Sequence, residues 1–347
     1  MNVVISGGAG FLGQRLARQL LRRGTLTGPT GEPTSIERLV LLDAVEAAGF
    51  DDPRVRVVVG DVADSGVVRQ AIDSSVGSVF HLAAVVSGQA ERDFDLGMRV
   101  NLDASRLVLE ACRAGGATPK VVFTSSVAVY GGQRPGEVDD DTPLTPQSSY
   151  GAQKAIAEML LGDYTRKGFV DGRVARLPTV SVRPGKPNQA ASSFASGIIR
   201  EPLNGEVAVC PVARDVKLWL LSPRRAIECL IALHEVPAQR LGDNRRINLP
   251  GLSVSVDEMI DALRAVGGNN AVDRIRFERD EAVQRIVGSW PASWSTTRAR
   301  ALGLEGDADF TAIVRAYVDD ELRQPFMHLS APHDPASHAA DPFTTNL

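Results

Sequence analysis

The sequence predicts an α/β fold built on a doubly wound parallel sheet, with a smaller C-terminal region interleaved with it. Short β-branched runs alternate with segments of helical periodicity along the chain, which is the order that such a sheet requires. A glycine-rich turn joins the first of these runs to the first helical segment. The 347 residues give room for roughly two domains.

The N-terminal segment predicts a strand, a tight turn and a helix. Residues 3–5 are Val-Val-Ile, which suits a buried strand, and apolar residues recur at helical spacing over 11–20. Between them, Gly7, Gly10 and Gly13 follow the pattern G-x-x-G-x-x-G, one residue wider in its first gap than the G-x-G-x-x-G form. Glycines here let the backbone approach a pyrophosphate held at the positive end of the helix. The segment therefore predicts a dinucleotide-binding Rossmann domain.

A second strand, residues 39–42, ends in Asp43. An acid at this place accepts hydrogen bonds from the adenosine ribose hydroxyls and repels a 2′-phosphate. No Arg or Lys lies between Asp43 and Arg54, so the sequence predicts NAD in preference to NADP. The acid lies farther from the glycines than the usual 20 or so residues. Residues 25–34, which are rich in Thr, Gly and Pro, account for the excess as an inserted loop.

The rest of the chain continues the alternation. Further strands are expected at residues 55–59, 78–84, 121–124 and 174–177, with a helix over 100–113 and a late strand near 245–249 that returns to the sheet. This order predicts an NAD-binding domain over 1–180, completed by the late strand. Segments 181–244 and 250–326 are predicted to form a substrate-binding region over the carboxyl edge of the sheet. Residues 328–347 lack periodicity and are predicted to form a mobile tail.

Three residues in the middle of the chain suit the removal of a proton from an alcohol. Ser126 closes an apolar run, and Tyr150 and Lys154 are four residues apart on a predicted helix, so their side chains share one face. A phenol has an ordinary pKa of about 10, and a cation beside it lowers that pKa by roughly 1–3 units. Tyr150 is therefore predicted to accept the proton, Lys154 to lower the phenol pKa, and Ser126 to hold the same substrate oxygen.

Composition argues against several classes of partner and site. The net charge of −4 gives no basic footprint for nucleic acid or an anionic membrane. No apolar stretch is long enough to span a bilayer, and the N-terminus begins a strand instead of a signal peptide. The three cysteines, Cys112, Cys210 and Cys229, do not follow metal spacing, so a cytoplasmic enzyme without a bound metal is expected.

These motifs together resemble the extended short-chain dehydrogenase/reductase superfamily, the NAD-dependent epimerases and dehydratases. The resemblance covers nearly the whole chain and implies a Rossmann fold, bound NAD and catalysis by Ser126, Tyr150 and Lys154. A homodimer is common in this superfamily and is the assembly that the resemblance suggests. For the cofactor, the resemblance implies contacts from Gly7, Gly10, Phe11, Leu12, Gly13, Asp43, Asp61, Val62, Leu82, Ala83, Ala84, Asn101, Ser125, Tyr150, Lys154, Pro178, Thr179 and Val180.

A narrower resemblance, to the D-erythronate dehydrogenase family, rests on longer stretches. They are residues 81–88 (HLAAVVSG), 93–97 (DFDLG), 176–188 (RLPTVSVRPGKPN), 191–202 (ASSFASGIIREP), 248–256 (NLPGLSVSV) and 285–291 (RIVGSWP). That family uses NAD to oxidise the C2 hydroxyl of a four-carbon sugar acid, D-erythronate, to 2-oxo-tetronate. The stretch 182–188 departs from the Tyr-Gly-Pro ending that is usual in nucleotide-sugar epimerases.

The residues themselves also favour a small anionic substrate. Arg183 and Lys186 follow the predicted strand at 174–177, at the edge where ligands of open α/β sheets bind. An Arg there can hold a carboxylate through two parallel hydrogen bonds, although it could instead be solvated or pair with Glu201. The predicted substrate contacts are Ser87, Ser126, Arg183 and Asn188, with Lys186 and Ser192 as further candidates.

Two other functions stay open at this point. A nucleotide-sugar epimerase or dehydratase uses the same Ser-Tyr-Lys set with retained NAD, and a non-catalytic NAD-sensing protein could share the scaffold. The intact pair of Tyr150 and Lys154 argues against a sensor, which needs no proton acceptor. His81 lies inside an apolar strand and is interpreted as a buried, hydrogen-bonded residue, and the acids at 139–141 are interpreted as facing water.

Overall fold

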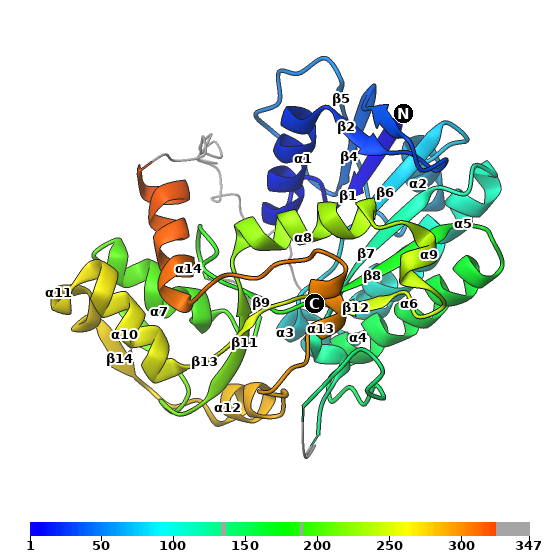
Figure 1. Ribbon diagram of the computed structural model, residues 1–347. Helices are drawn as coiled ribbons and strands as arrows, with labels where there is room; N and C mark the ends of the chain where they lie inside the picture. Colours follow the sequence, from blue (N-terminus) through cyan, green and yellow to red (C-terminus); the bar gives the residue numbers. More distant parts are fainter. Residues whose placement is uncertain (133–136, 188–189, 324–347) are drawn as a thin grey trace, which may run out of the picture.

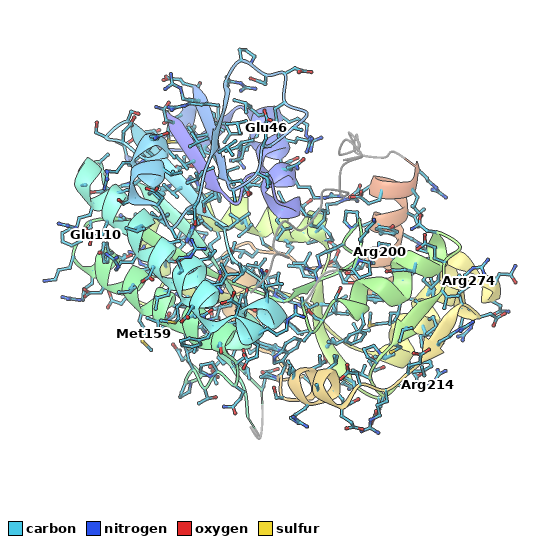
Figure 2. The ribbon with its side chains drawn as sticks, turned by 180° about the vertical axis from the view of Figure 1, so that it is seen from behind. Glu46, Glu110, Met159, Arg200, Arg214 and Arg274 are labelled. Carbon is cyan, nitrogen blue, oxygen red and sulfur yellow. The ribbon has the colours of Figure 1, made fainter. Side chains whose placement is uncertain are left out.

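The computed structural model describes residues 1–132, 137–187 and 190–323. Figure 1 shows a large part, which contains the central sheet, beside a smaller lobe formed by later segments of the chain. Seen from behind in Figure 2, Glu110 and Met159 lie on the large part, whereas Arg200, Arg214 and Arg274 lie on the smaller lobe.

The central sheet has seven strands, in the order β12-β8-β7-β6-β1-β4-β5, and every neighbouring pair is parallel. Their bounds are β1 (Asn2–Ser6), β4 (Arg38–Asp43), β5 (Val55–Val59), β6 (Val76–His81), β7 (Lys120–Ser126), β8 (Asp171–Leu177) and β12 (Arg246–Asn248). The order reverses between β1 and β6, so these strand ends form the crevice where open α/β sheets bind ligands. The predicted doubly wound parallel sheet is confirmed, and the late strand β12 pairs with β8.

Helices cover both faces of this sheet. One face packs on α1 (Phe11–Arg23) and α8 (Pro223–Glu235), and the other packs on α2 (Ser65–Ala71), α5 (Ala104–Gly115) and α6 (Ser149–Arg166). Helix α1 ends at Gly24, whose φ of 71° lets its N–H bond the Leu20 carbonyl at 2.8 Å. Helix α6 begins where the Ser148 side chain accepts a hydrogen bond from the Gly151 N–H.

The smaller lobe has an apolar core of its own, which includes Ile198, Leu218, Leu263 and Ile313. It contains α7 (Phe194–Leu203), β10 (Ala208–Cys210), β11 (Lys217–Leu221), β13 (Leu252–Ser255), α10 (Val256–Gly267), α11 (Asn269–Val272), β14 (Ile275–Phe277), α12 (Glu281–Gly288) and α14 (Phe310–Tyr317). Strand β11 pairs with β13 and with the short β9 (Thr179–Val180), which follows β8 directly. The chain therefore enters this lobe from the carboxyl edge of the central sheet.

The remaining elements include two differences from the expectations. Strands β2 (Thr25–Thr27) and β3 (Pro33–Ser35) form an antiparallel hairpin where a loop was predicted. The helix expected over 100–113 begins as the π-helix η1 (Met98–Asp103) and continues as α5. The others are α3 (Ser87–Arg92), α4 (Phe94–Gly97), the 3₁₀ helix η2 (Val127–Val129), α9 (Ala238–Leu241), α13 (Thr297–Ala301) and the π-helix η3 (Val318–Arg323).

The division into an NAD-binding domain and a substrate-binding region stays a prediction, and the tail predicted at 328–347 lies outside the described residues. In the part of the chain that the structure describes, no helix combines the length and the apolar character needed to cross a membrane. The same part contains no cluster of His, Cys, Asp or Glu that could hold a metal ion.

Candidate active site

A cavity of about 800 Å³ opens at the carboxyl edge of the central sheet and reaches into the smaller lobe. It collects most of the predicted site residues: Gly7, Gly10, Phe11, Leu12, Gly13, Asp43, Asp61, Val62, Leu82, Ala83, Ala84, Ser87, Ser125, Ser126, Tyr150, Lys154, Pro178, Thr179, Val180 and Arg183. Lys186 and Ser192 also line it. Asn188 lies outside the described residues, and Asn101 does not line the cavity.

The glycine-rich turn forms one end of the cavity and is too crowded for side chains. Gly7 has a φ of 75°, and a Cβ there would lie 2.8 Å from the backbone nitrogen of Ala83. A Cβ on Gly13 would overlap the carbonyl oxygen of Gly7. Helix α1 begins directly after Gly10, with no side-chain cap and no acid in its first turn. A helix N-terminus left in this form fits a pyrophosphate, so the turn fits the predicted NAD.

Asp43 ends β4 beside this turn. Its Oδ2 accepts a hydrogen bond from the Ala9 N–H at 3.0 Å, and its Oδ1 accepts one from the Val45 N–H at 3.4 Å. These bonds fix the carboxylate at the cavity wall. Because an ionised carboxylate offers only acceptors, and more of them than these two bonds use, Asp43 can still take a ribose hydroxyl.

Two of the residues predicted to contact the cofactor have other partners. Asp61 pairs with Arg99 at the cavity rim, and a hydrogen bond from the Ala63 N–H is the main cause that lowers the Asp61 pKa. Asn101 is fully buried, its Oδ1 accepts from the Val85 N–H at 2.9 Å, and its Nδ2 donates to Gln153 at 2.8 Å. Asn101 therefore supports the loop after β6 from behind, and its contact with the cofactor stays a prediction.

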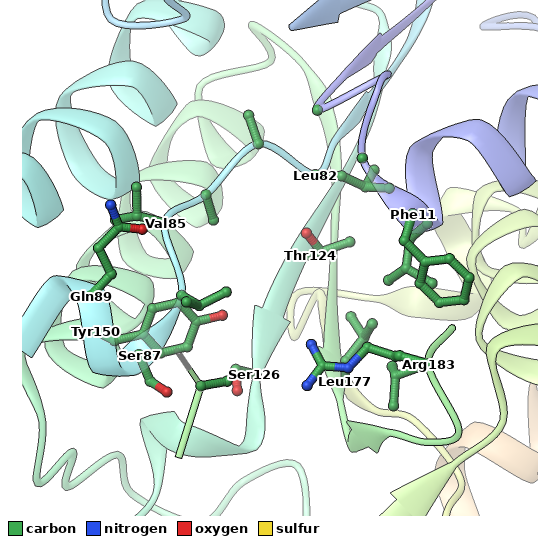
Figure 3. A pocket seen from close by; sticks show the side chains of 18 of the residues that line it. Phe11, Leu82, Val85, Ser87, Gln89, Thr124, Ser126, Tyr150, Leu177 and Arg183 are labelled. Carbon is green, nitrogen blue, oxygen red and sulfur yellow. The ribbon is translucent and has the colours of Figure 1, made fainter. Parts of the chain in front are cut away.

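The predicted catalytic residues come together in the middle of the cavity. Ser126 ends β7, while Tyr150 and Lys154 lie one turn apart on α6. Figure 3 shows the Tyr150 hydroxyl and the Ser126 side chain on one side and the guanidinium of Arg183 facing them from the other. Lys154 is buried, its Nζ donates to the Thr124 carbonyl at 2.9 Å, and it lies 5.7 Å from the centre of the Tyr150 ring.

Burial has the largest effect on the pKa values of Tyr150 and Lys154. It raises the pKa of Tyr150 to about 12, although the Ser126 side chain and then the Arg183 cation act to lower it. Burial also lowers the pKa of Lys154 to about 7, against the effect of Glu158. In the chain by itself burial outweighs the effects that lower the Tyr150 pKa, and the lowering of this pKa by Lys154 stays a prediction. The Lys154 ammonium points to the Thr124 carbonyl and the Phe123 ring.

The far end of the cavity is basic and is held by α7. The backbone N–H of Arg183 donates to the Ser196 hydroxyl at 3.0 Å. Arg200 Nη1 donates to the backbone carbonyl of Arg183 at 2.7 Å. Arg200 also pairs with Glu201 at 2.5 Å, so Glu201 pairs with this second arginine and not with Arg183, as the sequence had allowed. Burial lowers the pKa of Arg183, and the neighbouring Arg200 lowers it further. Such a site favours an anion.

Sequence reasoning did not find all the residues of this end. Arg200 and Ser196 line the cavity because α7 turns them inward. A charged residue next to the apolar pair 198–199 was the one local signal for Arg200. Ser125 was expected at the cofactor, and it lines the cavity, but its hydroxyl donates to Glu158 at 2.5 Å.

Comparison with known proteins gives a consistent set of relatives. Residues 3–225 match the NAD dependent epimerase/dehydratase family. The chain is 64% identical to a D-erythronate dehydrogenase of Cupriavidus necator over 92% of this chain and 98% of that protein. It is 44% identical to a D-erythronate dehydrogenase of Haemophilus influenzae, over 93% of this chain and 100% of that protein.

A solved structure gives the same overall fold. The chain is 41% identical to a protein of Agrobacterium tumefaciens described as a nucleoside-diphosphate-sugar epimerase, with a TM-score of 0.86. The match covers 93% of this chain and 95% of that one.

Proposed function

The chain belongs to the NAD dependent epimerase/dehydratase family and, within it, to the D-erythronate dehydrogenases, and on this premise we propose that it oxidises the C2 hydroxyl of D-erythronate to 2-oxo-tetronate. Both resemblances read from the sequence are confirmed, and the protein is an NAD-dependent oxidoreductase. One observation carries the proposal. The cavity that contains the glycine-rich turn also places a tyrosine and a serine opposite a partly buried arginine.

We propose that Gly7, Gly10 and Gly13 hold the pyrophosphate of NAD and that Asp43 holds its adenosine ribose. The crowded glycine turn and the fixed carboxylate support this assignment. Lys154, which lines the cavity beside Tyr150, is assigned to the ribose next to the nicotinamide. When bound, NAD supplies the acceptor for the two electrons and the hydrogen that leave C2 of the substrate.

In the proposed reaction, Tyr150 takes the proton of the C2 hydroxyl and Ser126 holds the same oxygen. A neutral phenol is a weak acceptor, and burial keeps the Tyr150 pKa high. The cations at Arg183 and Lys154 are therefore assigned the role of stabilising the phenolate. A substrate carboxylate bound to Arg183 would fix C2 in front of Tyr150.

The direct test is an assay of C4 to C6 aldonates and uronates in which the absorbance of NADH is followed. D-erythronate is expected to give the highest kcat/KM. A preference for hexuronates would replace the substrate assignment, and no NADH with any sugar acid would contradict the reaction type.

A test of the carboxylate site uses Arg183→Gln. The variant keeps hydrogen-bonding capacity and loses the charge, so KM for D-erythronate is expected to rise by roughly ten- to a hundred-fold, since hydrogen bonds to charged groups contribute about 1.5–3 kcal/mol. The KM for NAD should change little. Arg214→Gln is the control, because Arg214 is an exposed arginine of the smaller lobe that pairs with Asp257.

The second candidate is a nucleotide-sugar epimerase or dehydratase, and the Agrobacterium tumefaciens structure carries such a description. An enzyme of that kind retains its NAD through the reaction cycle. NAD that stays bound through purification, together with no release of NADH, would favour this candidate over the dehydrogenase.

We also propose a homodimer and a cytoplasmic location. The outer side of α6 exposes Ile156 and Met159, which supports a partner surface there (Figure 2). The three cysteines are free and buried, which suits a reducing compartment. Light scattering on the purified protein tests the dimer, and Met159→Glu is expected to shift it to a monomer.

A further inference from the structure

A buried acid lies directly behind the predicted catalytic pair. Glu158 follows Tyr150 and Lys154 at four-residue intervals on α6, so the three side chains share one face of the helix. Glu158 and Lys154 are each only 1% exposed. A carboxylate is rarely buried to this extent without strong partners.

Glu158 has four hydrogen bonds to such partners. Arg176 Nε donates to Oε1 at 3.0 Å and to Oε2 at 3.1 Å, and its Nη2 donates to Oε2 at 2.7 Å. The Ser125 hydroxyl donates to Oε1 at 2.5 Å. These donors suit an ionised carboxylate and hold it in one orientation.

The same acid is linked to both sides of the catalytic group. Ser125 is the neighbour of Ser126 on β7, and the carbonyl of the preceding Thr124 accepts the hydrogen bond from Lys154. Burial lowers the pKa of Lys154, and Glu158 is the charged residue that raises it. Glu158 therefore acts on the strand end that carries the serine and on the charge of the lysine.

The other ionisable groups around Lys154 do not supply this negative charge. His81 on β6 faces it, but burial and the Lys154 cation lower the His81 pKa to about 3, so the imidazole is neutral. Burial raises the Tyr150 pKa, so in the chain by itself the phenol is neutral and supplies no negative charge. Arg176 on β8 is a cation and reaches the site through its pair with Glu158.

We propose that Glu158 is a positioning residue for the reaction: it keeps the Lys154 ammonium charged and fixes the strand end that carries Ser126. The proposal rests on the proposed function for the roles of Lys154 and Ser126. It does not depend on which sugar acid is the substrate.

The test is the pH dependence of Glu158→Gln, a substitution that keeps the shape and removes the charge. NADH binding, followed by fluorescence, and kcat/KM are measured between about pH 5 and pH 9. Without the carboxylate, Lys154 loses its proton at lower pH. The pH above which NADH binding weakens is therefore expected to fall by about one unit, which corresponds to a tenfold change in the lysine ionisation constant. Glu158→Asp, which keeps the charge, should restore most of the native profile.

Asp171→Asn is the matched control. Asp171 begins the same strand, β8, pairs with the buried Arg173 at 2.9 Å and with Arg245 at 2.8 Å, and does not line the cavity. The variant removes a charged partner of the buried Arg173, which lies near the start of β8, away from Arg176. It should lower stability without moving the pH profile.

Glu158→Gln leaves Arg176 buried without its carboxylate, and such changes destabilise proteins strongly. If this variant does not fold, Glu158→Gln with Arg176→Gln removes both charges, and the profile should still move to lower pH. An unmoved profile in the folded variant overturns the proposal, as does an equal shift in Asp171→Asn. If neither Glu158→Gln nor the double variant folds, the role of Glu158 is purely structural, and this outcome also overturns the proposal. The NADH-binding profile needs no substrate, so a wrong substrate assignment gives a different result from a wrong role for Glu158.

Discussion

Burial moves the pKa values of Tyr150 and Lys154 in opposite directions, each toward the neutral side chain. The phenol is held protonated and the ammonium is close to losing its proton at neutral pH. Charges that enter or line the cavity therefore decide which of the two groups ionises. Among the described residues, Arg183 lowers the Tyr150 pKa and Glu158 raises the Lys154 pKa.

The first prediction at this scale concerns Tyr150→Phe. The change removes one oxygen and keeps the ring, so kcat should fall by roughly 10²- to 10⁴-fold, the usual contribution of a general base, while the affinity for NAD stays within about twofold. Steady-state kinetics and NADH fluorescence titration measure the two effects.

Tyr164→Phe is the control for this prediction. Tyr164 lies on the same helix α6, its hydroxyl donates to Glu110, and it does not line the cavity. This variant should keep its activity. A Tyr150→Phe enzyme that turns over at near the native rate would show that another group takes the proton.

At the scale of secondary-structure elements, β4 and the glycine turn act as one unit. The Gly7 and Gly8 N–H groups both donate to the Leu42 carbonyl, at 2.8 and 3.2 Å, and the Ala9 N–H donates to Asp43. The end of β4 therefore sets both the shape of the turn and the place of the acid that would meet the adenosine ribose.

Asp43→Asn should change the choice between NAD and NADP. The amide keeps an acceptor for the Ala9 N–H but loses the negative charge that repels a 2′-phosphate. The KM for NAD is expected to rise about tenfold and the KM for NADP to fall, as measured with D-erythronate at saturation. Asp52→Asn is the control, because Asp52 pairs with Arg54 outside the cavity. Unchanged ratios in Asp43→Asn would contradict the ribose assignment.

The elements of the central sheet could be predicted because each carries its own local signal. β1 and β4 are short apolar runs, and the turn between β1 and α1 requires glycine. The hairpin of β2 with β3 has no such signal, because it forms within a short polar stretch. Strand β11 is an apolar run, but its pairing with β9 and β13 depends on segments that are distant in the sequence.

The same limit applies to single side chains in loops. Asp140 was expected to face water with its neighbours, but it is buried, accepts a hydrogen bond from the Asn248 N–H at 2.6 Å and pairs with Arg298 at 3.5 Å. These partners are more than a hundred residues away in the sequence, so no local sequence pattern predicts the contacts. Arg200 was missed for the same reason, since its role follows from where the smaller lobe places α7. The motif residues Ser126, Tyr150 and Lys154 were found because their spacing itself carries the chemistry.

At the scale of the whole molecule, an ion network joins the C-terminal part of the smaller lobe to the helices of the sheet. Asp320 on η3 accepts from Arg224 of α8 at 2.6 Å and from Arg15 of α1 at 3.4 Å, and Arg15 also pairs with Glu321. The Arg15 guanidinium lies 4.9 Å from the centre of the Phe11 ring, which lines the cavity beside the glycine turn. The network therefore connects the position of η3 to the cofactor end of the site.

Asp320→Asn should loosen this connection. The variant removes the charge that faces two arginines from different helices, so the free energy of unfolding is expected to fall by about 1 kcal/mol, the upper end for a partly exposed pair. The KM for NAD should also rise by a few-fold, because Arg15 loses a partner that holds it over Phe11. Urea unfolding with and without NAD measures the first effect and steady-state kinetics the second. Asp319→Asn is the matched control, since the Asp319 carboxylate forms its ion pair with Arg323 inside η3, whereas Asp320 pairs with arginines of α1 and α8. If the two variants lose equal stability and bind NAD equally well, the contact of η3 with α1 and α8 does not support the cofactor site.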